Sequence, residues 1–187
     1  MADITSVGAH LSVGADVSPD ATANFNLVVL AAKERQHDVD RFPTKVYRCP
    51  LSDDGVPTTA EVKRAQECAA LVAWTIAPEK VPWAIWVKLG KDKMFDGVAR
   101  VEITKANVLI TCEAGLDRSC WIAAMVLVLI GEQRTGKEAR EHIQKIRGPK
   151  AFSNAGMKQE IDKFYPEELA AIRLPGLDVS THGFSVR

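Results

Sequence analysis

The sequence has no excess of charge of either sign. Among its 187 residues, 24 lysines and arginines balance 24 aspartates and glutamates, so the formal net charge is zero. Without a field of one sign, the protein has no general attraction for nucleic acid or for an anionic membrane surface. We therefore expect neither as a partner, and any anion must be bound by a local arrangement of donors.

The sequence also lacks the segments that direct a chain into a membrane. Residues 1–14 contain no basic start followed by an apolar run, which a secretory signal would have. The longest apolar run, residues 121–130, is much shorter than the roughly 20 residues of a transmembrane helix and is typical of a buried helix. We therefore expect a cytoplasmic protein.

Cysteine is scarce, and its spacing excludes two common uses. The four cysteines (Cys49, Cys68, Cys112 and Cys120) form neither a disulfide framework nor the CxxC pattern of a metal site. Reduced thiols are the default without a secretory signal. Cys49, Cys68 and Cys120 have no motif around them, so we expect them in the core. We predict no metal and no other cofactor.

Short apolar runs predict the strands of an α/β fold. Residues 26–32 are such a run, and residues 45–49 are predicted to be a second strand that Pro50 ends. Residues 107–110 show no polar alternation, as in a central strand covered on both faces. Strands early in the chain, a central strand and then helices in series predict a central, mostly parallel sheet flanked by helices.

Capping residues predict where the helices begin. Thr58 and Glu61 form a capping box ahead of a periodic apolar segment, and Thr135 and Glu138 form another. Asn154 caps one more helix. The helix after Thr135 is predicted to end at Arg147 and to turn three apolar residues inward: Ala139, Ile143 and Ile146.

The length predicts a single domain over residues 1–187. Residues 77–104 are predicted to be an insertion, with a β-hairpin formed by residues 83–89 and 98–103. Pro166 suits the first turn of a short helix. Residues 174–187 are predicted to form an extended tail, because they show no periodicity.

The segment that carries chemistry follows the predicted strand at residues 107–110. Cys112 and Arg118 enclose a short loop with Gly115 in its middle, and the apolar run 121–130 follows. A tight loop from a strand into a helix directs backbone N–H groups and the positive end of the helix dipole into one small concavity. The segment therefore predicts a binding site for a tetrahedral oxyanion such as phosphate.

The side chains of this segment suit an attack on phosphorus. Gly115 permits a backbone conformation that a Cβ would obstruct. The planar fork of Arg118 can donate to two phosphate oxygens at once. The helix N-terminus and the guanidinium favour the thiolate of Cys112, which is the attacking species. Ser119 can donate a hydrogen bond to that sulfur when it becomes the leaving group. The alternative is that Cys112 is a small buried hydrophobe.

Cys112-Glu-Ala-Gly-Leu-Asp-Arg118-Ser119 resembles the signature of the protein tyrosine phosphatase superfamily, and of its compact dual-specificity branch in particular. The resemblance extends loosely over residues 26–164. Residues 27–34 are similar to the family's early strand and the turn after it, and residues 50–53 to the loop that delivers the general acid. The resemblance implies the family's fold, with residues 77–104 inserted before the signature strand.

The resemblance implies a two-step hydrolysis that needs no cofactor. Cys112 attacks phosphorus to give a phosphocysteine, while Asp53 protonates the leaving oxygen and later activates water. Asp53 is favoured over the neighbouring Asp54 because it directly follows Pro-Leu-Ser. The phosphate oxygens would be bound by the backbone N–H groups of Glu113, Ala114, Gly115, Leu116, Asp117 and Arg118.

Two residues depart from the family pattern. Thr111 stands where the family has histidine, and its hydroxyl can bond the backbone instead. Asp117 lies in the phosphate loop, and we expect it to face outward or to pair with a cation. The implied substrate is phosphotyrosine in proteins, with phosphoserine and phosphothreonine in addition. The alternatives are a catalytically impaired phosphoprotein-binding module, a phosphatase of a non-protein phosphate ester, and a sulfur-transfer or arsenate-type enzyme.

Overall fold

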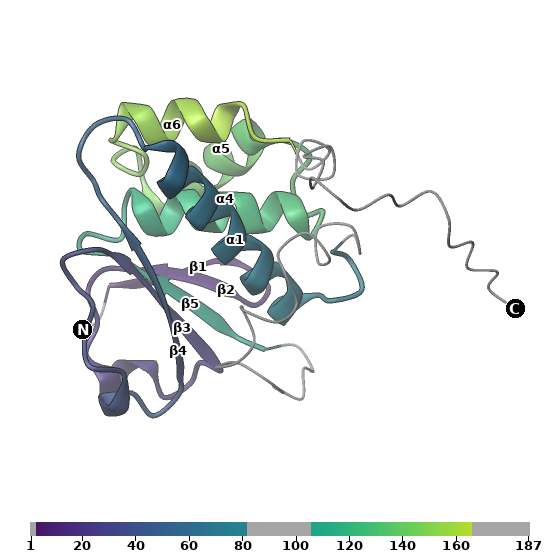
Figure 1. The fold of residues 1–187 in the computed structure, drawn as a ribbon. Helices are drawn as coiled ribbons and strands as arrows, with labels where there is room; N and C mark the ends of the chain where they lie inside the picture. Colours follow the sequence, from purple (N-terminus) through teal and green to yellow (C-terminus); the bar gives the residue numbers. More distant parts are fainter. Residues whose placement is uncertain (1–2, 82–105, 166–187) are drawn as a thin grey trace, which may run out of the picture.

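A computed structural model describes residues 3–81 and 106–165, which form a five-stranded sheet covered by helices (Figure 1). The strand order is β1-β2-β5-β3-β4, and only β1 runs antiparallel to its neighbour. The strands are β1 (Ile4–Gly8), β2 (Leu11–Gly14), β3 (Leu27–Ala32), β4 (Lys45–Leu51) and β5 (Val108–Thr111). The predicted central, mostly parallel sheet is confirmed. The β1–β2 hairpin adds two strands that the sequence analysis did not predict.

The four described α-helices lie together on one face of the sheet (Figure 1). They are α1 (Thr59–Ile76), α4 (Arg118–Leu129), α5 (Gly136–Arg147) and α6 (Ala155–Asp162). Every residue of α4 is buried, because α1, α5, α6 and the sheet surround it, and this confirms a buried helix at residues 121–130. In the described part of the chain, no helix combines the length and the apolarity that a membrane crossing requires.

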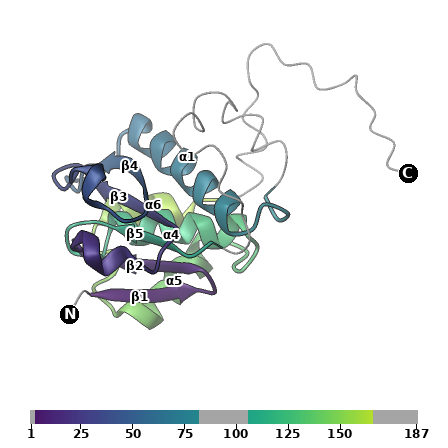
Figure 2. The same ribbon diagram turned by 90° about the horizontal axis from the view of Figure 1, so that it is seen from below.

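The other face of the sheet is covered by loops and two short 3-10 turns, Pro19–Thr22 and Val39–Arg41, as the view from below shows (Figure 2). Val28, Leu30 and Leu109 pack there against Val17 and Phe42. The alternate residues of β3 and β5 pack under the helices. Both faces are therefore apolar, which explains the absence of polar alternation in the central strand.

The helix starts agree with the predicted caps, with one difference. Thr58 and Glu61 form a complete capping box at α1, and Asn154 accepts from the N–H of Met157 at α6. At α5, Thr135 accepts from the N–H of Glu138, but the Glu138 carboxylate accepts from the N–H of Arg134 instead of closing the box. The second capping box is therefore only half formed.

The inward face of α5 differs from the prediction at its last turn. Ala139 and Ile143 are fully buried, but Ile146 is 44% exposed. The buried stripe continues from Ile143 to the side chain four residues on, Arg147, which is buried against β1 and the loop after β5. The expectation that Ile146 turns inward is wrong. The predicted hairpin at residues 83–103, the helix at Pro166 and the tail at 174–187 lie outside the described residues.

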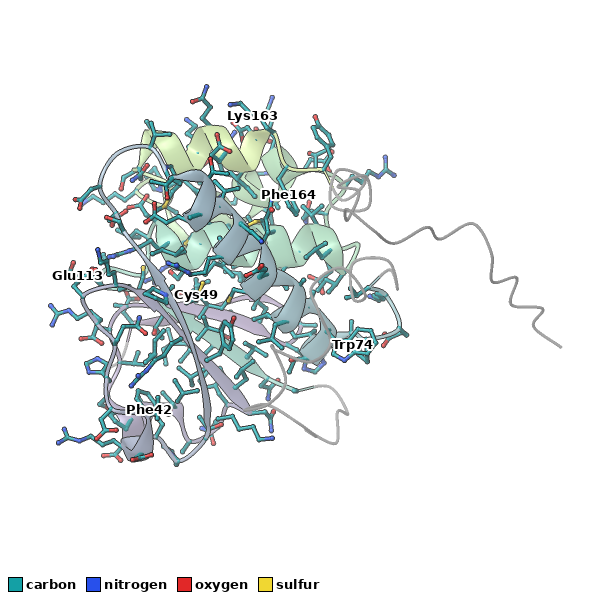
Figure 3. All side chains as sticks on the ribbon, in the orientation of Figure 1. Phe42, Cys49, Trp74, Glu113, Lys163 and Phe164 are labelled. Carbon is teal, nitrogen blue, oxygen red and sulfur yellow. The ribbon has the colours of Figure 1, made fainter. Side chains whose placement is uncertain are left out.

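The three cysteines that were predicted to lie in the core do lie there. Cys49, Cys68 and Cys120 are each 0% exposed, and Cys49 lies in the interior between the sheet and the helices (Figure 3). Burial raises the pKa of the Cys120 thiol to about 12 and that of Cys68 well above its usual range. A protonated thiol is a poor nucleophile, so Cys68 and Cys120 serve packing. Cys49 packs in the same core cluster.

Candidate active site

The predicted loop lies at the end of the central strand. β5 ends at Thr111, residues 112–117 form the loop, and α4 begins at Arg118. β5 runs parallel to both β2 and β3, so the ends of three strands meet at this edge of the sheet. None of the backbone N–H groups of residues 113–117 has a hydrogen-bond acceptor within residues 3–81 and 106–165. These groups remain available to an anion at the N-terminus of α4.

Gly115 gives the loop its curvature. Its φ is +69°, and a Cβ there would lie 2.6 Å from the backbone N of Ala15, the carbonyl carbon of Gly14 and Nη2 of Arg147. The loop is further held by Arg147, whose Nε donates to the Gly115 carbonyl over 3.1 Å. The sequence analysis did not single out Arg147, whose guanidinium also binds Asp3.

Gly115→Ala is expected to destabilise the protein more than Gly131→Ala does. Gly131 has a similar φ of +73° but nothing within 4 Å of a Cβ, so its substitution costs only the backbone preference, about 1–2 kcal/mol. At Gly115 the backbone of residues 14 and 15 must move as well. Urea denaturation of both variants measures the difference, and equal losses would show that the loop accommodates the methyl group.

Cys112 begins the loop, and its side chain is nearly enclosed. It is 3% exposed, and its Sγ lies 3.3 Å from the Oγ of Ser119, which is itself 0% exposed. The Cys112 N–H donates to the carbonyl of Gly14 over 3.2 Å. The Thr111 hydroxyl bonds the backbone, as expected. Its acceptor lies in the neighbouring strand β3, where the hydroxyl donates to the Val29 carbonyl over 3.2 Å. Cys112 and Ser119 are therefore brought together, with the serine placed to donate to the sulfur.

Arg118 is a buried cation held by carboxylates. Its side chain is 1% exposed, and Nη1 lies 2.6 and 2.7 Å from the two carboxylate oxygens of Glu34. Nη2 lies 3.5 Å from Oδ2 of Asp53 and 3.9 Å from Oε2 of Glu113. Burial opposes the charge, but the Glu34 hydrogen bond and the Asp53 charge raise the pKa of the guanidinium. Nε is buried without a hydrogen-bond partner in the described part of the chain.

Glu34 is the partner of Arg118 to which the sequence analysis gave no role. Burial acts to raise the pKa of Glu34, but its own backbone N–H and the Arg118 guanidinium outweigh that effect and lower the pKa. Glu34 follows β3, which is the parallel neighbour of β5. Residues that follow adjacent parallel strands meet at one edge of a sheet, so the position of Glu34 directly after a predicted strand could have indicated that it lies near Arg118.

Asp53 follows β4 and reaches the same edge of the sheet. Burial raises the pKa of its carboxyl, Arg118 opposes this, and the charges of Asp117 and Glu34 reinforce it. The amide Nδ2 of Asn154 donates to the Asp53 carbonyl over 3.0 Å. Asp54 instead accepts from the hydroxyl of Ser52 over 3.0 Å. Of the two neighbouring aspartates, only Asp53 lies beside Arg118.

Asp117 neither faces outward nor pairs with a cation, so that expectation is wrong. Its side chain is buried, and its two oxygens accept from the Ser153 hydroxyl and the Asn154 N–H, each over 2.7 Å. The segment after α5 supplies both donors, so a carboxylate is satisfied inside the protein without an ion pair.

The rim beside the loop carries alternating charges. Glu113 lies near the N-terminal end of α4 at the edge of the molecule (Figure 3), and it accepts from Nη2 of Arg35 over 3.1 Å. Arg35 lies 3.8 Å from Asp16, which also contacts the ring of His37. The cation Arg35 therefore lies between two carboxylates, those of Glu113 and Asp16. Of the other loop residues, Ala114 is exposed and Leu116 accepts from the Phe152 N–H.

This architecture is the fold of the protein tyrosine phosphatase superfamily in its compact dual-specificity form, as the sequence resemblance predicts. Three solved structures share it over 90% of this chain at 18% identity: Tk-PTP in its active form (TM-score 0.59, 96% of that chain covered), human DUSP28 (0.59, 95%) and PTPMT1 (0.55, 96%). No protein-family model and no curated protein sequence matches the chain. At this identity the likeness concerns the fold.

Proposed function

We propose that this protein is a cysteine-dependent phosphatase of the protein tyrosine phosphatase superfamily, acting on phosphotyrosine in proteins and additionally on phosphoserine and phosphothreonine. Arg118 carries the proposal: it is 1% exposed, and its Nε has no partner within the described residues. A buried donor left unpaired costs about 1–3 kcal/mol. A phosphate oxygen would accept from it, as would the unpaired N–H groups of residues 113–117.

In the first step of the proposed reaction, the Cys112 thiolate attacks phosphorus and forms an S–P bond. The P–O bond to the leaving group breaks, and the proton of Asp53 goes to the leaving oxygen. The position of Asp53 beside Arg118, at 3.5 Å, supports this role. The raised pKa of Asp53, which burial causes, keeps the carboxyl protonated to higher pH than an exposed aspartate.

In the second step, water attacks the phosphocysteine and gives its proton to the Asp53 carboxylate. The S–P bond breaks, phosphate leaves, and the sulfur recovers its electron pair. Ser119 supports this step, because its hydroxyl lies 3.3 Å from the sulfur and can donate to the developing thiolate. The atoms and charges balance without a metal or a redox partner.

The charges at the site favour a substrate with a single phosphate. PTPMT1, one of the similar structures, is solved in complex with PI(5)P. Here Glu34, Asp53 and Glu113 surround Arg118, and the cation Arg35 is neutralised by Glu113. A second anionic group beside the reacting phosphate would approach a carboxylate. A phosphotyrosine side chain presents only one anionic group.

Two further expectations belong to this proposal. All four cysteines are free, which supports a reducing compartment and hence the cytoplasm. We also propose one phosphatase domain over residues 1–187.

The test is turnover of p-nitrophenyl phosphate by the full chain at mildly acidic pH, with a thiol reductant and with or without a chelator. We expect phosphate release that the chelator does not reduce. A panel of a phosphotyrosine peptide, a phosphoserine peptide and PI(5)P should show the highest kcat/KM for phosphotyrosine. Peptide binding without turnover would favour the binding module, and sulfur transfer or arsenate reduction without phosphate release would replace the proposal.

A further inference from the structure

Asp117 occupies the N-cap position of α4 but does not cap the helix. An N-cap aspartate ordinarily accepts from a backbone N–H in the first turn, and no such bond is present here. Both carboxylate oxygens instead reach the segment before α6, where they accept from the Ser153 hydroxyl and the Asn154 N–H. The side chain is 8% exposed and pairs with no cation within the described residues. Burial of a carboxylate costs free energy, and the two hydrogen bonds to Ser153 and Asn154 are the interactions that offset this cost for Asp117.

Asn154 connects Asp117 to the loop that carries Asp53. Its Oδ1 accepts from the Met157 N–H and caps α6, while its Nδ2 donates to the Asp53 carbonyl over 3.0 Å and lies 3.5 Å from Oδ1 of Asp53. The same loop rests on α6 at Gly156, where a Cβ would lie 2.8 Å from the Gly55 carbonyl oxygen. Asn154 is thus bonded both to Asp117 in the phosphate loop and to Asp53 in the loop after β4.

We propose that Asp117 is a positioning residue for the general acid: it fixes Asn154, and Asn154 holds Asp53 beside Arg118. The inference rests on the proposed function. Aspartate suits this role because it offers one acceptor to the Ser153 hydroxyl and another to the Asn154 N–H, which a small residue at this position cannot do. The bonds of Asn154 to Asp117 and to Asp53 thereby fix the position of the Asp53 loop relative to the phosphate loop.

Leaving-group dependence tests this role, because only a poor leaving group needs the proton from Asp53. The phenolate of phenyl phosphate needs this proton to leave, whereas the p-nitrophenolate of p-nitrophenyl phosphate leaves readily without it. Asp117→Ala is expected to lower kcat/KM for phenyl phosphate about ten-fold more than for p-nitrophenyl phosphate, a fraction of the 10²–10⁴ that a general acid contributes. Asp117→Asn keeps one acceptor and should restore part of the difference.

Asn154→Ser is the second variant, and it decides the matter if Asp117→Ala does not fold. Serine preserves the helix cap and the N–H donor to Asp117, and it removes only the amide that reaches Asp53. It should show the same selective loss on phenyl phosphate. Asp162→Asn is the matched control, because it weakens the Arg140–Asp162 contact between α5 and α6 without touching the Asp53 loop.

The pH profile provides a second readout. Burial is the main cause of the raised pKa of Asp53, Arg118 and the Asn154 amide lower it, and the charges of Asp117 and Glu34 raise it. Removal of the Asp117 charge in Asp117→Asn should therefore move the alkaline limb of kcat/KM to lower pH. In the control variant Asp162→Asn, the alkaline limb of kcat/KM should lie at the same pH as in the wild type.

Wild-type turnover separates the two hypotheses. Absence of turnover in the wild type would overturn the proposed function itself. Turnover in the wild type with equal losses on both substrates in Asp117→Ala and Asn154→Ser would overturn only the positioning role. The same leaving-group effect in Asp162→Asn would also overturn it, since general loosening of α6 would then suffice.

Discussion

Cys112→Ser is expected to lower kcat for p-nitrophenyl phosphate by at least about 10⁴-fold, the scale of loss when a catalytic nucleophile is removed. A serine hydroxyl is not appreciably ionised near neutral pH and needs a neighbouring base. The described surroundings of Cys112 offer a hydroxyl, Ser119 at 3.3 Å, and no such base in hydrogen-bond contact. Steady-state release of p-nitrophenol measures the loss.

The same variant should still bind its substrate. Arg118 and the N–H groups of residues 113–117 are unchanged in Cys112→Ser, so the affinity for a phosphotyrosine peptide should remain measurable by titration calorimetry. Cys68→Ala is the control, because Cys68 is a 0% exposed core residue of α1. Turnover that survives in Cys112→Ser would refute covalent catalysis by this thiol. Loss of binding together with turnover would indicate collapse of the loop.

The parts of the fold that could be predicted were those encoded locally. The capping box of Thr58 and the apolar run of α4 depend on residues close in sequence, and both are present. The strands β3 and β5 are apolar on both faces and therefore stand out. The hairpin β1–β2 contains polar and small residues, Thr5, Ser6, Gly8 and Ser12 among them, so its strands gave no apolar signal.

The site divides in the same way. The signature from Cys112 to Ser119 is one continuous segment, and its order along strand, loop and helix was predictable. Glu34 and Asn154 reach it from segments 84 and 36 residues away from Arg118. Their roles follow from the parallel order β4-β3-β5 and from the start of α6, which a single sequence does not reveal. Asp117 was misplaced because its two donors lie beyond α5.

Asp53→Asn is expected to lower kcat/KM for phenyl phosphate by about 10²- to 10⁴-fold, the usual contribution of a general acid. Asparagine keeps the shape of the side chain but has no proton of suitable acidity to give. The loss on p-nitrophenyl phosphate should be smaller, because its phenolate leaves without full protonation. The matched control is Asp54→Asn, in which the neighbouring carboxyl bonded to Ser52 is changed and wild-type turnover is expected.

The activity that depends on Asp53 should be lost as the pH rises, because the protonated carboxyl is the form that acts as the acid. Burial raises the pKa of Asp53, and Asp117 and Glu34 add to the effect against Arg118. A raised pKa keeps the proton on the carboxyl to higher pH, and the acid fails only as the pH rises past that pKa. Wild-type kcat/KM for phenyl phosphate should therefore fall on the alkaline side, and Asp53→Asn should lack that limb. An unchanged alkaline limb in Asp53→Asn would assign the proton to another group, and Asp54→Asn would then be tested as its source.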